Sequence, residues 1–347
     1  MTYQTRDATQ VQHTDDPPLV ARLARARGVR ASVCAWAGVN ALLLGIAGDH
    51  LPFHASELAD PPAVMTVLQT NAMFLEVFAL MLVVHLLTRH RVPPDLAARA
   101  PVHSQAIRET VGLLGYGVAA MTVGYLVTTA LGWHAFSFHL DGMVIRTDQE
   151  VVPAEAICWA AYNLVVYAVA PLWFFRRRYS GEQLGLHSSD LRADLRIILV
   201  VLVVESTLQL SLDHAVLDLD ARQLALGTPV TFVLSFAGTM LPTMVFVFCI
   251  LTPRYLRITG SAASTVALGG LTYAALHVLD GWTSLASPTD ITLSVLYVLL
   301  FYTAPGMFKT FLTLRTGNAW VHVWAYHAIA PHTLIDTPMF VKVFGIR

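Results

Sequence analysis

The chain has 347 residues, of which 55% are hydrophobic and only 13% are charged, and its formal net charge is -1. A soluble globular domain carries about 25% charged residues, so this composition, with a mean hydropathy of +0.58, excludes an ordinary soluble fold and indicates a membrane protein. The near-neutral charge and the lack of a basic, aromatic-rich patch exclude nucleic acid as a partner, and the expected partner is the lipid bilayer.

The first 31 residues are predicted to form a cytoplasmic tail. Residues 1–18 are polar and end in two aspartates and two prolines, a composition typical of disorder. The basic stretch that follows suits the anionic surface of a cytoplasmic leaflet, and its arginines are Arg22, Arg25, Arg27 and Arg30.

Nine apolar runs follow, each close to the roughly 20 residues that a helix needs to cross a bilayer. We therefore predict an all-α fold, a polytopic transmembrane helical bundle of about nine spans, or eight if the weak first run is re-entrant. The runs cover residues 32–47, 63–87, 107–131, 154–175, 196–212, 228–251, 261–279, 291–307 and 318–335.

The charges between the runs predict the orientation. With the N-terminus in the cytoplasm, all but four of the 22 Lys and Arg residues lie on the inner side. This asymmetry follows the positive-inside rule and predicts a multi-pass protein of the plasma or inner cell membrane. The four residues on the outer side are Arg146, Arg222, Lys342 and Arg347.

A basic loop divides the spans into two groups. Residues 176–196 begin with three consecutive arginines and end in a mixed-charge stretch typical of a short interfacial helix. We therefore predict a four-span part over residues 32–178, a five-span domain over residues 179–338 and a C-terminal tail over residues 339–347. The three cysteines lie in apolar runs without CxxC spacing, so neither a disulfide framework nor a thiolate zinc site is predicted.

Glu205 is the first costly polar group within a predicted span, and Gln209 follows it one helical turn later. Two interpretations remain open. Glu205 is either a protonated packing residue that bonds to Gln209 or a neighbouring helix, or a functional group that acts as a general base or a metal ligand.

Histidines in the last spans are the main candidates for a functional site. His277 has Asp280 three residues later, and His332 has Asp336 four residues later, so each imidazole has a carboxylate on its own helical face. Pro331 should kink the last span and turn both His327 and His332 inward. The predicted metal ligands are His277, His327, His332 and Asp336, with zinc as the expected ion. Five other histidines lie in loops or near span ends and are assigned no role: His85, His90, His134, His139 and His187.

These motifs resemble those of the CAAX prenyl protease and bacteriocin-processing family of integral membrane proteins, also called CPBP or ABI. Members carry a Glu-Glu-x-x-x-Arg motif, then Phe-x-x-x-His, then His-x-x-x-Asn/Asp, on separate spans. Residues 273–277 are similar to the second motif, with Tyr for Phe, and residues 332–336 to the third. Residues 179–186 and 314–320 are similar to segments that precede the domain and the third motif in family members.

The resemblance implies a divergent CPBP-like intramembrane hydrolase, a metallo-endopeptidase for membrane-embedded or lipidated peptides. The first Glu of the Glu-Glu motif activates the attacking water in the family, yet residues 238–245, where the motif is expected, contain no acid. Glu205 would then be the displaced base, and the expected catalytic set is Glu205, His277, His332 and Asp336.

Two alternatives stay open. The first is a non-proteolytic scaffold or immunity-type protein that keeps the fold. The second is a membrane oxidoreductase with iron or copper held by His277, His322, His327 and His332. A hydrolase requires Glu205 or another acid within hydrogen-bond reach, directly or through one water, of a group shared by His277 and His332. An oxidoreductase requires bound iron or copper and three or more imidazole nitrogens at one point.

Overall fold

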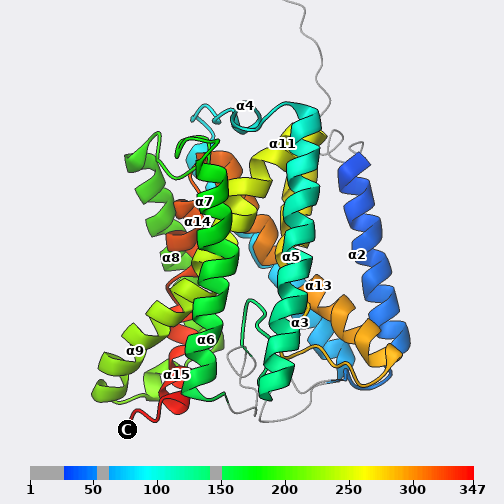
Figure 1. Ribbon diagram of the computed structural model, residues 1–347, viewed down its shortest axis with the longest axis vertical. Helices are drawn as coiled ribbons and strands as arrows, with labels where there is room; N and C mark the ends of the chain where they lie inside the picture. The colour runs from blue at the N-terminus through cyan, green and yellow to red at the C-terminus, as the bar shows by residue number, and fades with distance from the viewer. Residues whose placement is uncertain (1–26, 53–61, 141–150) are drawn as a thin grey trace, which may run out of the picture.

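The structure is a computed structural model that describes residues 27–52, 62–140 and 151–347. Every regular element in these residues is helical (Figure 1), as the sequence predicts. The proposed disordered segment, residues 1–18, and Arg146 lie outside the described residues. Arg27 and Arg30, assigned to the tail above, belong to the first turn of a helix.

Seven helices in the described residues are long and apolar enough to cross a membrane. Five of them are continuous α-helices, namely α2 (Arg27–Ile46), α3 (Ala63–Thr88), α5 (His103–Leu131), α8 (Leu191–Leu212) and α13 (Pro288–Thr316). The other two, Pro153–Arg176 and Ala221–Thr259, contain wider π-helical turns. The first consists of α6 (Pro153–Asn163), η1 (Leu164–Val169) and α7 (Ala170–Arg176). The second consists of α9 (Ala221–Ser235), η3 (Phe236–Met240), α10 (Leu241–Thr243), η4 (Met244–Leu251) and α11 (Thr252–Thr259).

The two remaining apolar runs are helical but shorter or interrupted, and they carry the histidines. One is α12 (Ala262–Ala275), and the other is a series of short elements: α14 (Trp320–His322), η5 (Val323–His327), η6 (Ala330–Ile335) and α15 (Thr337–Val343). Short α4 (Leu96–Arg99) and η2 (Ala215–Asp218) connect longer helices. The interfacial helix expected before residue 196 is instead the first turn of α8, which Asp190 caps by accepting a hydrogen bond from the Ala193 backbone N–H.

The outer surface of the bundle is apolar, which is the reverse of a soluble protein. Leucines on the outer faces of α3 and α8 are largely exposed, with Leu75 at 72% and Leu199 at 63%. α2 lies at the edge of the bundle and buries little surface (Figure 1), whereas 72% of the most apolar stretch in Ala221–Thr259 is buried. Exposed hydrocarbon over whole helices is stable in lipid, so a bilayer is the environment of this multi-pass chain.

α12 and α13 cross closely because small residues line their contact. A Cβ atom added to Gly306 would lie 2.9 Å from the Gly270 Cα, 3.0 Å from the Gly270 carbonyl oxygen and 2.6 Å from the Tyr273 Cβ. Two of these atoms belong to the backbone and cannot move aside alone. Glycine at this crossing lets the helices approach closely enough to pack Tyr273 and His277 against α13.

Gly306→Ala is therefore expected to destabilise the protein by about 1–3 kcal/mol through overpacking. Gly115→Ala in α5 is the matched control, since no atom lies within 4 Å of its added Cβ and alanine favours a helix by roughly 1 kcal/mol. Unfolding by sodium dodecyl sulfate in mixed micelles measures both. Equal stability of the two variants would show that the crossing tolerates a larger separation.

Candidate metal centre

A loop after α5 carries a histidine into the bundle. α5 ends at Leu131, the following Gly132 has a φ of 68° that reverses the chain, and the next residues fold back between the helices. The Ser137 carbonyl accepts hydrogen bonds from Trp159 Nε1 at 2.8 Å and from Asn163 Nδ2 at 2.7 Å. The Phe138 carbonyl accepts a bond from Thr239 Oγ1 at 2.6 Å. These hydrogen bonds satisfy the buried carbonyl groups of a non-helical segment. They hold the following His139, which is 5% exposed, inside the protein.

His277 lies just beyond the end of α12 with one ring nitrogen free for a ligand. Its Nδ1 is 2.7 Å from the Tyr273 carbonyl oxygen, which can only accept, so Nδ1 carries the hydrogen and Nε2 the lone pair. Nε2 is buried and has no hydrogen-bond partner among the described residues. The ring stacks on Tyr302 with centroids 4.0 Å apart. The ring is thus fixed in the tautomer that binds metal through Nε2.

The last apolar segment aligns its histidines by π-helical turns. His322, His327 and His332 are five residues apart, and i to i+5 bonding brings residues with that spacing to neighbouring positions on one face. Such bonds join the Ala328 N–H to the Val323 carbonyl at 2.7 Å and the Leu334 N–H to the Ile329 carbonyl at 2.8 Å. The kink expected at Pro331 is therefore part of a wider change in helix geometry.

Two histidines and two aspartates form a continuous buried chain of contacts. The Asp280 carboxylate Oδ2 lies 3.2 Å from His139 Nδ1. His139 Nε2 lies 3.1 Å from His332 Nε2, and His332 Nδ1 lies 3.0 Å from Asp336 Oδ2. All four side chains are less than 10% exposed.

When both imidazoles are neutral and both carboxylates are ionised, this series of contacts has one N–H hydrogen too few. Three contacts need three hydrogens, whereas two neutral imidazoles supply only two N–H groups. Either an extra proton or a metal cation must fill one contact, because two lone pairs facing each other in a buried site repel.

His277 indicates which contact suits a cation. Ligand atoms of His139, His277 and Asp280 all lie within 4.8 Å of one another. Ligands of tetrahedral zinc at about 2.0–2.1 Å are separated by roughly 3.3 Å, so small side-chain rotations would close the three around one ion. With a cation there, His139 Nε2–H donates to His332 Nε2 and His332 Nδ1–H donates to Asp336, and every contact is satisfied.

A second group of polar side chains adjoins the histidines. Lys309 Nζ donates to Tyr273 Oη at 2.6 Å, and the same hydroxyl lies 3.4 Å from His327 Nε2. The His327 and His332 rings are in contact, with centroids 4.7 Å apart. The His322 ring packs against Phe248, with ring centroids 4.2 Å apart.

The structure brings together most of the residues predicted from the sequence. Of the predicted ligands, His277 belongs to the group that could hold one metal ion, together with His139 and Asp280. His332 contacts that group through His139, and Asp336 and His327 contact His332. Glu205 is placed differently: its side chain accepts from Gln209 at 3.0 Å, and its charged neighbours are Glu76 and Lys309. No hydrogen bond among the described residues joins Glu205 directly to a histidine, and its role as the displaced base stays a prediction.

Sequence reasoning assigned no role to His139 and treated Asp280 only as a neighbour of His277. The available signal was the short apolar run Phe-Ser-Phe-His-Leu at residues 136–140, directly after a predicted span. An apolar run too short to cross the bilayer, with one histidine in it, is typical of a loop that folds back into a bundle. Comparison with known proteins adds no identification, because no known family, curated protein or solved structure matches the chain.

Proposed function

We propose that this protein is a metal-dependent hydrolase of the membrane and a divergent member of the CPBP-like proteins that its motifs resemble. His139, His277 and Asp280 would hold the metal, and His332 and Asp336 would orient His139 from behind. The observation that carries the proposal is the convergence of His139, His277 and Asp280, whose ligand atoms lie within 4.8 Å of one another, with His277 Nε2 buried and without a hydrogen-bond partner among the described residues.

Zinc with three protein ligands keeps a fourth position for water and makes that water acidic enough to act as a nucleophile near neutral pH. The protein's part is to fix the ligands and exclude bulk water. The Tyr273 carbonyl fixes the His277 tautomer, and the Asp336 carboxylate fixes His332, which in turn fixes His139. The substrate class that fits a site within apolar helices is a membrane-embedded or lipidated peptide.

The proposed placement in the membrane follows the charge asymmetry of the sequence. We propose nine crossings with a cytoplasmic N-terminus in the plasma or inner membrane, counting α12 and the α14–η6 segment with the seven longer helices. The main support is that most Lys and Arg residues fall on one side of the membrane when nine crossings are assumed. Adding or removing one crossing would move every later loop to the opposite side and spread these residues over both sides.

Elemental analysis of the detergent-purified protein tests the metal site. The expected result is about one zinc per chain in the unmodified protein and almost none in His277→Ala, because that change leaves two ligands. His85→Ala, an exposed histidine of α3, is the control and should keep its zinc. Peptidase activity toward a lipidated peptide in vesicles should be lost with chelator and return with zinc.

Other results of the metal analysis would support one of the two alternative functions. Stoichiometric iron or copper would replace the hydrolase by the oxidoreductase alternative. No metal in the unmodified protein, with no peptidase activity, would reject the proposal in favour of a scaffold whose histidine chain holds a proton.

A further inference from the structure

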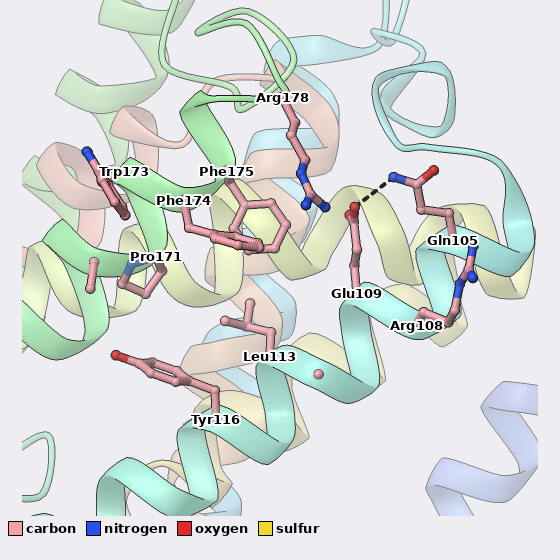
Figure 2. Close-up of a pocket in the computed structure, with 12 residues that line it drawn as sticks. Gln105, Arg108, Glu109, Leu113, Tyr116, Pro171, Trp173, Phe174, Phe175 and Arg178 are labelled. Atoms are coloured by element: carbon pink, nitrogen blue, oxygen red, sulfur yellow. Dashed lines mark hydrogen bonds between the residues drawn. The ribbon is translucent and has the colours of Figure 1, made fainter.

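A groove lies between α5 and α7. Its volume is about 640 Å³. Figure 2 shows the side chains of α5 on one side and those of α7 on the other, with polar groups gathered toward one end.

Most of the groove is lined by hydrocarbon. Leu113 and Tyr116 come from α5, and Pro171, Phe174 and Phe175 come from α7. Tyr116 does not offer a free donor there, because its hydroxyl bonds to the Val166 carbonyl at 2.8 Å. A surface of this kind, open on the outside of a membrane bundle, suits an acyl chain.

The one carboxylate in the groove is already neutralised. Glu109 accepts from Arg254 Nη2 at 2.6 Å and from Arg254 Nε at 2.9 Å. It also accepts from the Tyr179 hydroxyl at 2.8 Å and from Gln105 Nε2 at 2.9 Å. Glu109 therefore does not oppose the binding of an anion nearby.

Two arginines at this end form no ion pair with a described carboxylate. Arg108 and Arg178 are exposed and form no hydrogen bond through the side chain and no ion pair with any described residue. The Arg178 guanidinium lies over the Phe174 ring, 5.0 Å from its centroid, and extends into the groove beside Glu109 (Figure 2). Arg108 lies in the second turn of α5, and Arg178 lies just after the last residue of α7. The start of α5 and the end of α7 form the same end of the groove, so both arginines lie there.

We propose that this groove binds an anionic phospholipid. Its phosphate lies between Arg108 and Arg178, and one acyl chain lies along Leu113, Tyr116 and Phe174. Charge complementarity favours this ligand: the groove joins hydrocarbon walls to two arginines that pair with no described carboxylate, while its own carboxylate, Glu109, is paired with Arg254. A zwitterionic lipid has the same chains but a headgroup that carries its own cation, so it gains less from the arginines.

Quenching of Trp173 by brominated lipids tests the proposal, since Trp173 lines the groove. The full chain is placed in vesicles with phosphatidylglycerol or phosphatidylcholine brominated on the acyl chains, and the Trp173 signal is the difference from Trp173→Phe. Phosphatidylglycerol is expected to occupy the groove about fivefold or more in preference to phosphatidylcholine, the factor that roughly one arginine supplies near a membrane surface.

In the double variant Arg108→Gln/Arg178→Gln, the ratio of phosphatidylglycerol to phosphatidylcholine in the groove should fall close to one. Arg192→Gln removes an exposed arginine of α8 that does not line the groove, and it should keep the preference. Equal quenching by both lipids in the unmodified protein would overturn the proposal and indicate bulk lipid in the groove. A preference that persists in the double variant would overturn it as well.

Discussion

His139→Ala is expected to abolish the proposed metal binding and hydrolysis, although sequence reasoning gives His139 no role. The variant removes the ring that connects Asp280 to His332, and Asp280 loses its imidazole partner. Loss of an outer partner of a ligand alone costs 10–100-fold in metal affinity, so loss of a ligand should cost more. Elemental analysis and zinc titration of the purified variant measure the effect.

His332→Ala tests whether His332 binds the metal itself or supports the ligand His139. His332 lies behind His139, so its removal should weaken zinc binding by roughly 10–100-fold and leave zinc bound at saturating concentration. His134→Ala is the matched control in the same loop, because the His134 ring lies against Glu155, with Nδ1 2.7 Å from the Glu155 Oε1. Complete loss of zinc in His332→Ala with retention in His139→Ala would reverse the assignment of the two histidines.

The helical architecture could be predicted because it depends on local sequence. Apolar runs of about 20 residues fix where helices cross a bilayer, whatever their partners are. The contact between His332 and Asp336 was predictable for the same reason, since four residues span one turn. Two runs proved shorter or more broken than their composition suggested, because α12 ends at Ala275 and the last run changes to π-helical turns.

The centre of the site could not be predicted because its contacts are distant in sequence. His139 is 141 residues from Asp280 and 193 from His332, and no local pattern indicates such pairs. The five-residue spacing of the last histidines argues against a common face in an ordinary helix, and only π-helical turns reconcile them. Glu205 has neighbours of both kinds: Gln209 lies one turn away on its own helix and was predictable, whereas Glu76, which interacts with the Glu205 side chain, lies on α3 and was not.

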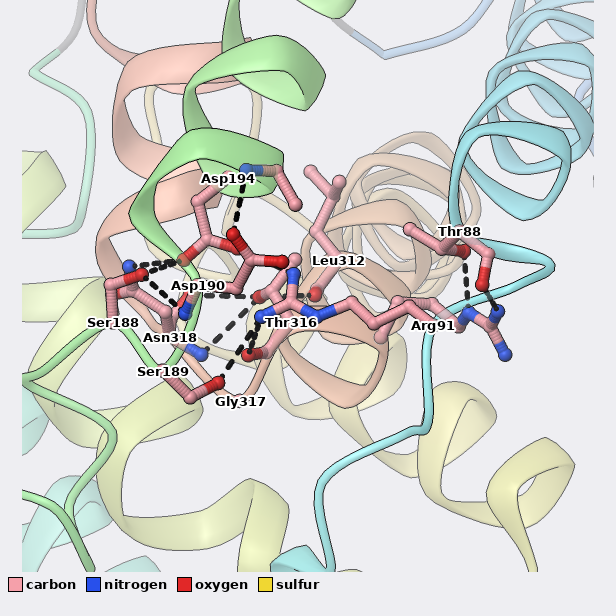
Figure 3. A network of polar contacts seen from close by, with 12 residues as sticks. Thr88, Arg91, Ser188, Ser189, Asp190, Asp194, Leu312, Thr316, Gly317 and Asn318 are labelled. Carbon is pink, nitrogen blue, oxygen red and sulfur yellow. Dashed lines mark hydrogen bonds and ion pairs between the residues drawn. The ribbon is translucent and has the colours of Figure 1, made fainter.

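Asp194→Ala is expected to cost about 3–5 kcal/mol of folding free energy, because Asp194 joins three segments of the bundle. Its Oδ1 pairs with Arg91 Nη1 at 2.6 Å, after α3. Its Oδ2 accepts from Ser188 Oγ at 2.7 Å and from Asn318 Nδ2 at 2.9 Å (Figure 3). Asp194 is fully buried, so its loss leaves a largely buried guanidinium without its carboxylate.

Asp190→Ala provides the matched control in the same helix. Asp190 is exposed and caps α8 through the Ala193 N–H, so its replacement should cost only about 1 kcal/mol. Unfolding in mixed micelles by sodium dodecyl sulfate measures both variants. Because Asn318 starts the segment that carries His332, Asp194→Ala should also weaken zinc binding, whereas Asp190→Ala should not. Equal losses of stability in the two variants would mean that Asp194 stabilises only α8. The segment that begins at Asn318 would then be held in place by packing.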